Sequence, residues 1–158
     1  MKKHISNFIF NVSDALANTS SDIINISQMV PAWDIANMTD FKLDSEVRVN
    51  GSIQKVERGK ILGIFQVKYK IKGRCYRCLI DTSQGISFDT EAIFSVYDNA
   101  DHEEYKISKY GDINIQDLLE QEIITHLPQD FKCESSCKGL CSECGVNLNT
   151  KKCKCRKV

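Results

Sequence analysis

The chain has 158 residues, enough for one domain and an appendage. Hydrophobic residues make up 42% of it, an ordinary share for a globular core, and no apolar run approaches the roughly 18 residues of a membrane span. The formal net charge is zero, so the protein is neither strongly basic nor strongly acidic as a whole.

The first 40 residues carry weak patterns. We interpret Ile5–Phe10 as a short strand and Ser13–Ala17 as a helical turn. Ser27–Ile35 is predicted to form a short helix with Pro31 inside its first turn. Trp33, the only tryptophan, is expected to pack within the core or at its edge.

A long antiparallel hairpin is predicted next. Apolar residues fall largely on alternate positions from Phe41 to Ile53, and strictly so from Phe65 to Ile71. The residues Glu57–Lys60 form the turn between these strands, and lysines occupy the face opposite the apolar one. Alternation of this kind is typical of a sheet with one buried face.

A third strand is predicted over Ile86–Val96, so the C-x2-C pair of Cys75 and Cys78 falls at the rim of the sheet between two strands. The polar residues 98–112 are predicted to form a loop with a short strand at Tyr105–Ser108.

Asn114 is the expected N-cap of a helix that ends before Pro128. Four residues of this helix should lie on the sheet: Ile115, Leu118, Leu119 and Ile123.

The remaining cysteines lie in a tail that contains few apolar residues. Two cysteines with two residues between them can bind a tetrahedral metal ion through a short knuckle turn. Such an ion can order a segment that has no hydrophobic core of its own. Without a recognisable secretory segment we expect a reducing cytoplasm, where thiols favour metal over disulfides. The expected ligands of one or two Zn²⁺ ions are Cys75, Cys78, Cys133, Cys137, Cys141, Cys144, Cys153 and Cys155.

The cysteines are expected to form two sites of four. The favoured assignment groups the last four, Cys141 to Cys155, in a local site, and joins Cys75 and Cys78 to Cys133 and Cys137. Interleaved pairing is the main alternative. A redox dithiol is a weaker alternative, since the pair in the hairpin lacks the helix that thioredoxin-like chemistry needs.

Catalysis finds little support in the sequence. There is no glycine-rich phosphate loop and no metalloprotease motif, and a site filled by four thiolates has no open position for a substrate. The histidines His4, His102 and His126 lack ligand spacing and are interpreted as structural or surface residues. No catalytic residue and no small-molecule substrate is therefore expected.

Charge is segregated along the chain. Lysines and arginines dominate both cysteine-containing stretches, whereas acids dominate residues 81–130. The cations either offset the negative charge of bound thiolates or contact a polyanion such as RNA. The candidate RNA-binding residues are Lys68, Lys70, Lys72, Arg74, Tyr76, Arg77, Lys138, Lys151, Lys152, Lys154, Arg156 and Lys157.

Several motifs together resemble one family. These are the run Arg74–Leu79 (RCYRCL), the helix ending in Leu127-Pro128, the segment Cys137–Asn149 (CKGLCSECGVNLN) and a final C-x-C. In this order they resemble the bacterial large ribosomal RNA subunit accumulation proteins. Members often carry proline where this chain has Ser142, a small departure, and some relatives are expected to lack part of the tail cluster.

The resemblance implies metal roles for all eight cysteines and turn or backbone-capping roles for Gly139, Gly145, Asn147 and Asn149. It also implies a cytoplasmic, non-catalytic factor for 23S ribosomal RNA accumulation, processing and large-subunit assembly. The partners would be 23S ribosomal RNA or its precursor, with no membrane. An alternative is a zinc-stabilised adaptor whose acidic residues 81–130 dock a ribosomal protein or an RNA-processing enzyme.

The sequence thus predicts an α+β fold: a mainly antiparallel sheet with a long hairpin, one packed helix and a cysteine-rich tail of zinc-knuckle type. Residues 1–130 would form the β-rich domain, and residues 131–158 a metal-binding tail packed on it through Cys75 and Cys78.

Overall fold

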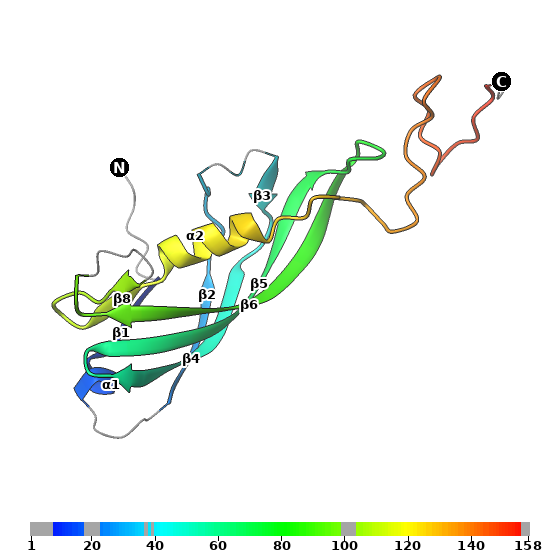
Figure 1. Cartoon of the computed structure of the whole chain (residues 1–158). Coiled ribbons are helices and arrows are strands. Elements are labelled where there is room, and N and C mark those ends of the chain that lie inside the picture. Colours follow the sequence, from blue (N-terminus) through cyan, green and yellow to red (C-terminus); the bar gives the residue numbers. More distant parts are fainter. Residues whose placement is uncertain (1–7, 18–22, 37, 39, 99–103, 156–158) are drawn as a thin grey trace.

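A computed structural model describes residues 8–17, 23–36, 38, 40–98 and 104–155. Its main element is a six-stranded sheet with the order β2-β4-β5-β6-β7, to which β3 adds on β5 (Figure 1). A separate two-stranded ladder pairs β1 (Ile9–Asn11) with β8 (Asp112–Asn114). The fold is α+β, as predicted, and no helix in the described ranges is long and apolar enough to cross a bilayer.

The centre of the sheet is the predicted hairpin. Strand β4 (Val47–Glu57) turns at Arg58-Gly59 into β5 (Lys60–Arg74), and β5 pairs along its whole length with β6 (Asp81–Ser95). Strand β6 therefore begins earlier than the predicted Ile86. Alternate β5 side chains are buried, among them Val67, Tyr69 and Ile71, as period-2 alternation requires.

Helix α2 (Gln116–Thr125) covers the buried face of this sheet (Figure 1). Its residues Leu118, Leu119 and Ile123 are buried together with Ile115, as predicted. The Tyr69 hydroxyl lies 3.4 Å from the carbonyl oxygen of Ile123 and donates to it. His126, just beyond the helix, stacks on Phe88 at 4.1 Å between ring centroids, so its role is packing.

Two predictions about element ends are wrong. Asn114 lies in β8 rather than at the helix N-cap, a position that Ile115 occupies. The Asn114 Oδ1 still accepts the N–H of Gln116, so the asparagine satisfies one free donor from one position earlier. The first strand of the predicted hairpin is also interrupted. Phe41–Leu43 forms a separate strand, β3, which pairs with β5 on the same side as β4 does.

The predicted helix over Ser27–Ile35 is wrong as well. Residues Ile24–Val30 form β2, which pairs with β4 from Ile24 opposite Ile53 to Val30 opposite Val47. Pro31 follows the last residue of this strand, at a position where no ladder donor is needed. Trp33 packs edge-to-face on Phe8 at 4.9 Å, in keeping with its expected place at the core edge.

Short elements complete the chain. Ser13–Ala17 is helical (α1), as predicted. The predicted strand Ile5–Phe10 is found only as β1, and Ile5, His4 and His102 lie outside the described residues. The predicted strand at Tyr105–Ser108 is shorter: β7 comprises Tyr105–Lys106 and runs parallel to the end of β6.

Candidate metal centres

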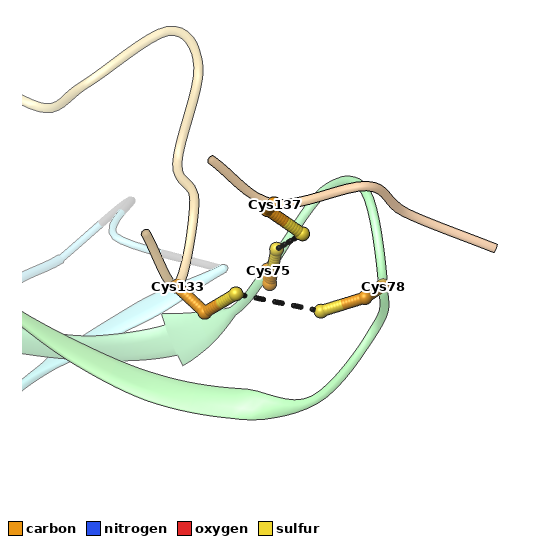
Figure 2. Close-up of side chains that lie close together, drawn as sticks. All are labelled: Cys75, Cys78, Cys133 and Cys137. Atoms are coloured by element: carbon orange, nitrogen blue, oxygen red, sulfur yellow. Dashed lines mark hydrogen bonds between the residues drawn. The ribbon is translucent and has the colours of Figure 1, made fainter. Parts of the chain in front are cut away.

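The first group of thiols joins the tail to the tip of the β5–β6 hairpin; we call it the proximal group. Cys75 and Cys78 lie in the connection between the two strands, and Cys133 and Cys137 come from the tail after α2 (Figure 2). Their sulfur atoms all lie within 4.8 Å of one another. Three of the four are buried, the exception being half-buried Cys133.

The second group, which we call the distal group, is local. It contains Cys141, Cys144, Cys153 and Cys155, whose sulfurs also lie within 4.8 Å of one another. It is more open, since Cys141 and Cys153 are half-buried and Cys144 is exposed. This grouping is the assignment that the sequence favoured, and the interleaved alternative is not found.

The sulfur positions fit a tetrahedral ion. Four thiolates at about 2.3 Å from a metal place neighbouring sulfurs about 3.8 Å apart. The separations are 3.9 Å between Cys75 and Cys137 and 3.6 Å between Cys78 and Cys133 (Figure 2). In the distal group, Cys153 lies 3.3 Å from Cys141 and 3.8 Å from Cys144. All are much longer than the roughly 2.05 Å of a disulfide.

Each group begins with a knuckle turn, and the two turns have the same hydrogen bonds. In the proximal knuckle the N–H of Leu79 donates to the carbonyl of Cys75 at 2.9 Å, and the N–H of Cys75 donates to Ile80 at 2.8 Å. In the distal knuckle the N–H of Gly145 donates to Cys141 at 2.9 Å, and that of Cys141 to Val146 at 2.9 Å.

The knuckle backbones also stabilise one thiolate each. Burial raises the pKa of Cys75, but N–H groups that include those of Cys78 and Arg77 donate to its sulfur, and the net pKa is about 6. The equivalent N–H groups of Cys144 and Glu143 lower the pKa of Cys141 to about 7.

Other thiols in the groups resist ionisation. Burial raises the pKa of Cys133 to about 12, and the neighbouring Cys153 thiol raises that of Cys155 to about 12. Four thiolates can therefore coexist in one group only when a cation offsets their charge, as a bound metal ion does.

Asn149 connects the two groups. It lies in the loop between Cys144 and Cys153, yet its Nδ2 donates to the Cys137 sulfur at 3.4 Å. Its Oδ1 accepts the N–H of Lys138 at 2.7 Å. Asn147 Oδ1 in turn accepts the backbone N–H of Asn149 at 2.9 Å. Both asparagines therefore cap backbone donors, as the resemblance implies, and Asn149 also contacts a thiol of the other group.

An apolar contact that the sequence analysis missed anchors the start of the tail. Phe131 is completely buried (0% exposed), and its ring lies 5.0 Å from that of Phe41 and 6.4 Å from that of Tyr76. Its carbonyl accepts the N–H of Tyr76 at 2.8 Å. The signal in the sequence was a single aromatic residue at the first position of the tail, two positions before Cys133.

The described candidate RNA-binding residues lie along β5, along the tail and at the hairpin tip between these two regions. Lys68, Lys70 and Lys72 are exposed along β5, whereas Lys138, Lys151, Lys152 and Lys154 are exposed along the tail. Arg74, Tyr76 and Arg77 lie at the hairpin tip between them. Arg77 has a structural contact, because its Nη1 donates to the Cys137 carbonyl at 3.0 Å. Arg156 and Lys157 lie outside the described residues.

Two further cations join the first region. The sheet register places Arg48 opposite Lys68 and Lys42 opposite Lys72, on the same face. Neither residue lies near a cysteine in the sequence, so the search for cations around the cysteine motifs missed both. The strand register is the signal that identifies them.

Comparisons with known proteins agree with the motifs. Residues 64–158 match the family described as large ribosomal RNA subunit accumulation protein YceD. A chloroplastic YCED homolog 1 from Zea mays is 37% identical over 103 residues, which is 64% of this chain and 31% of the maize protein. The Arabidopsis thaliana homolog 1 is 47% identical over 53 residues, 33% of this chain and 14% of that protein.

The chain therefore spans less than a third of the length of either relative. No solved structure is significantly similar to it.

Proposed function

The chain belongs to the large ribosomal RNA subunit accumulation protein family, and from this premise we propose that it is a non-catalytic factor for accumulation of 23S ribosomal RNA. The two plant relatives are named large ribosomal RNA subunit accumulation proteins, and this name supports the proposal. In this chain the role would be assembly or processing of the large-subunit RNA precursor, in the reducing cytoplasm where free thiols persist.

We propose Zn²⁺ as the ion of both groups. Four thiolates are a soft donor set that suits zinc in structural sites, and such sites are closed to substrates. All four donors of each group come from the protein, which leaves no position for a reacting water. Structural rather than catalytic zinc is thus the reading that the donor sets support.

One observation carries the proposal: the proximal group holds the basic tail against the basic hairpin tip. The N–H of Leu140 donates to the carbonyl of Arg77 at 3.1 Å, beside the contact between Arg77 and Cys137. The hairpin tip and the tail, which both carry exposed cations, therefore lie at one end of the molecule (Figure 1). The proposed RNA contacts are Lys68, Lys70, Lys72, Arg74, Arg77, Lys138, Lys151, Lys152, Lys154, Arg156 and Lys157, with Tyr76, which is 47% exposed, as a stacking group.

Two measurements test this proposal. Metal analysis of protein purified under reducing conditions should find two zinc ions per chain, and a content near zero would refute the zinc assignment. Binding to a fragment of the 23S precursor should weaken steeply with salt, because each neutralised phosphate releases counterions. Absence of binding at about 50 mM salt would refute the proposal that the chain itself binds RNA.

An adaptor role is the second candidate, favoured by the outer edge of β6. Within the described residues β6 pairs on that side only at Phe94 and Ser95, and Asp81, Asp89 and Glu91 are exposed along the rest of the strand. A basic partner could add a strand to this edge. RNase treatment separates the candidates: it abolishes recovery of ribosomal proteins in a pull-down if RNA is the bridge and spares it if the contacts are between proteins.

A further inference from the structure

We propose that the open face of the main sheet binds the phosphate backbone of double-stranded RNA, a proposal that rests on the proposed function and locates its principal contact. We call this surface the lysine face. It is opposite the face that α2 covers. Its cations are Lys42, Arg48, Lys68, Lys70 and Lys72.

The register gathers these cations in one compact patch. Lys68, Lys70 and Lys72 occupy alternate positions of β5 and span about 13 Å at 3.3 Å per residue. Arg48 on β4 and Lys42 on β3 lie directly opposite the first and last of them, one strand spacing away. The patch is therefore two strands wide.

The register also places two exposed acids on this face, Asp81 opposite Arg74 and Asp89 opposite Gln66, one beyond each end of the lysine row. None of the five cations forms an ion pair with a described acid, although other lysines do, such as Lys60 with Glu104 at 2.7 Å. Asp44, one of the two acids between β3 and β4, accepts a hydrogen bond from the Ser83 hydroxyl at 2.6 Å. Glu46 borders the same surface. Exposed, unpaired cations at this density are held together against their mutual repulsion, which a polyanion would relieve.

The neighbouring strand β6 leaves room for a ligand. Opposite Lys72, Lys70 and Lys68 it carries Ser83, Gly85 and Ser87, all small. Gly85 and Ser87 help to line a shallow hollow together with Arg48, Lys68 and Lys70.

Gly85 in this row has no explanation within the fold. A Cβ there would meet nothing within 4 Å, its φ is not positive, and the β5–β6 register is continuous, so no bulge requires it. Glycine inside a strand weakens it and often marks a place where a ligand approaches closely.

The composition of the face favours a duplex over a single strand. Single strands are held largely by bases stacked on aromatic rings. The described residues of this face, including Asn50, Ser52 and Gln66 beside the cations, contain no aromatic side chain. Duplex RNA offers mainly phosphates and 2′-hydroxyls, which lysines, arginines and serines recognise.

The first experiment compares two charge-neutralised variants of the full zinc-loaded chain. One is Lys68→Gln/Lys70→Gln/Lys72→Gln on the face, and the matched control is Arg58→Gln/Lys106→Gln/Lys109→Gln, three exposed cations outside the proposed RNA contacts. The probe is a 20-base-pair RNA duplex of arbitrary sequence, titrated at several salt concentrations. We expect the face variant to lose at least tenfold in affinity and to flatten the salt slope by about 2.7, three phosphate contacts at 0.9 each.

A wild-type chain that binds no duplex would overturn this proposal, and the 23S-precursor assay above tells separately whether the proposed function also fails. If the wild type binds, an unchanged face variant, or equal losses in the face and control variants, overturns the lysine face alone. Tighter binding of a single strand than of the duplex overturns it as well.

The second experiment fills the space above Gly85. Gly85→Thr should keep or raise the thermal midpoint, because threonine suits a strand and meets no neighbour, yet it should weaken duplex binding at least fivefold. The control is Gln84→Thr, an exposed position on the opposite side of β6. Equal binding by both variants would contradict close approach of RNA at this point.

Discussion

The proximal and distal cysteine groups share one knuckle geometry but have different surroundings. The proximal group lies against the protein core: Cys75, Cys78 and Cys137 form a small buried cluster with Leu140, next to fully buried Phe131. The distal group has no such cluster, and its thiols are partly or fully exposed. The same knuckle motif therefore has two structural roles. In the proximal group it adds to an existing hydrophobic core, whereas in the distal group it orders a segment that has no such core.

The largest test of this comparison removes one ligand from each group. Cys78→Ser should lose the proximal ion, release the tail from the hairpin tip and lower the thermal midpoint by roughly 10 °C, which is about 3–4 kcal/mol for a chain of this size. Cys144→Ser should lose the distal ion with little change in that midpoint. Metal content and calorimetry measure both, and equal destabilisation by the two variants would remove the distinction.

The next test removes the apolar anchor that only the proximal side has. Phe131→Ala should cost about 3–5 kcal/mol, since a fully buried ring in contact with Phe41 leaves a cavity. Urea unfolding measures this cost. As the matched control, Leu148→Ala in the half-buried distal loop should cost about 1 kcal/mol or less. A small loss at Phe131 would mean that metal alone attaches the tail.

Asn149 tests how far the two groups are coupled. Asn149→Ala removes the donor to the Cys137 sulfur and should weaken proximal metal binding 10- to 100-fold, as loss of a hydrogen bond to a metal ligand usually does. Competition with a chromophoric chelator measures the affinity. Ser142→Ala, at an exposed position of the distal knuckle, serves as control. Unchanged proximal affinity in Asn149→Ala would show the groups to be independent.

The smallest effect concerns the left-handed backbone position of the two knuckles, where they carry different residues. Leu79 has φ of 60° where the distal knuckle has Gly145 at 70°. A non-glycine residue in the left-handed conformation destabilises the fold by about 1–2 kcal/mol. Because Leu79 is 54% exposed, packing of its side chain offsets little of this cost. We expect Leu79→Gly to stabilise the protein by roughly 1 kcal/mol after the greater unfolded-state entropy of glycine is subtracted.

The reverse exchange, Gly145→Leu, should destabilise the distal knuckle by about 1–2 kcal/mol through the backbone alone, because a Cβ there meets nothing within 4 Å. Chemical denaturation of the first variant and distal metal affinity of the second report these effects. A destabilising Leu79→Gly would show that the leucine side chain contributes packing despite its exposure.

Features of the fold and of the cysteine groups could be predicted where residues close together in the sequence carry the pattern. Strict alternation along β5 and helical spacing from Ile115 to Ile123 identified the sheet and its covering helix, because packing on one face imposes those periods. Sequence proximity likewise favoured the distal group, and the four cysteines that remained formed the proximal one. These signals each lie within a few turns or strands of the chain.

The misses arose from tertiary context. Ser27–Val30 became a strand because β4 offered an edge with which to pair, which no local propensity reports. Arg48 and Lys42 joined the lysine face through strand register, and Phe131 became an anchor through contact with Phe41, which lies ninety positions earlier in the numbering. Contacts of this kind depend on the fold as a whole.

The chain separation within the proximal group has a consequence for the order of folding. Cys78 and Cys133 are 55 residues apart and Cys75 and Cys137 are 62 apart, with β6 and α2 between them. Closing such a loop in an unfolded chain costs about 3.5 kcal/mol, against about 2.4 for the fifteen-residue distal span. Ion capture at the hairpin tip should therefore follow sheet and helix formation. A filled proximal group would then mark a polypeptide whose β-rich body has already matured.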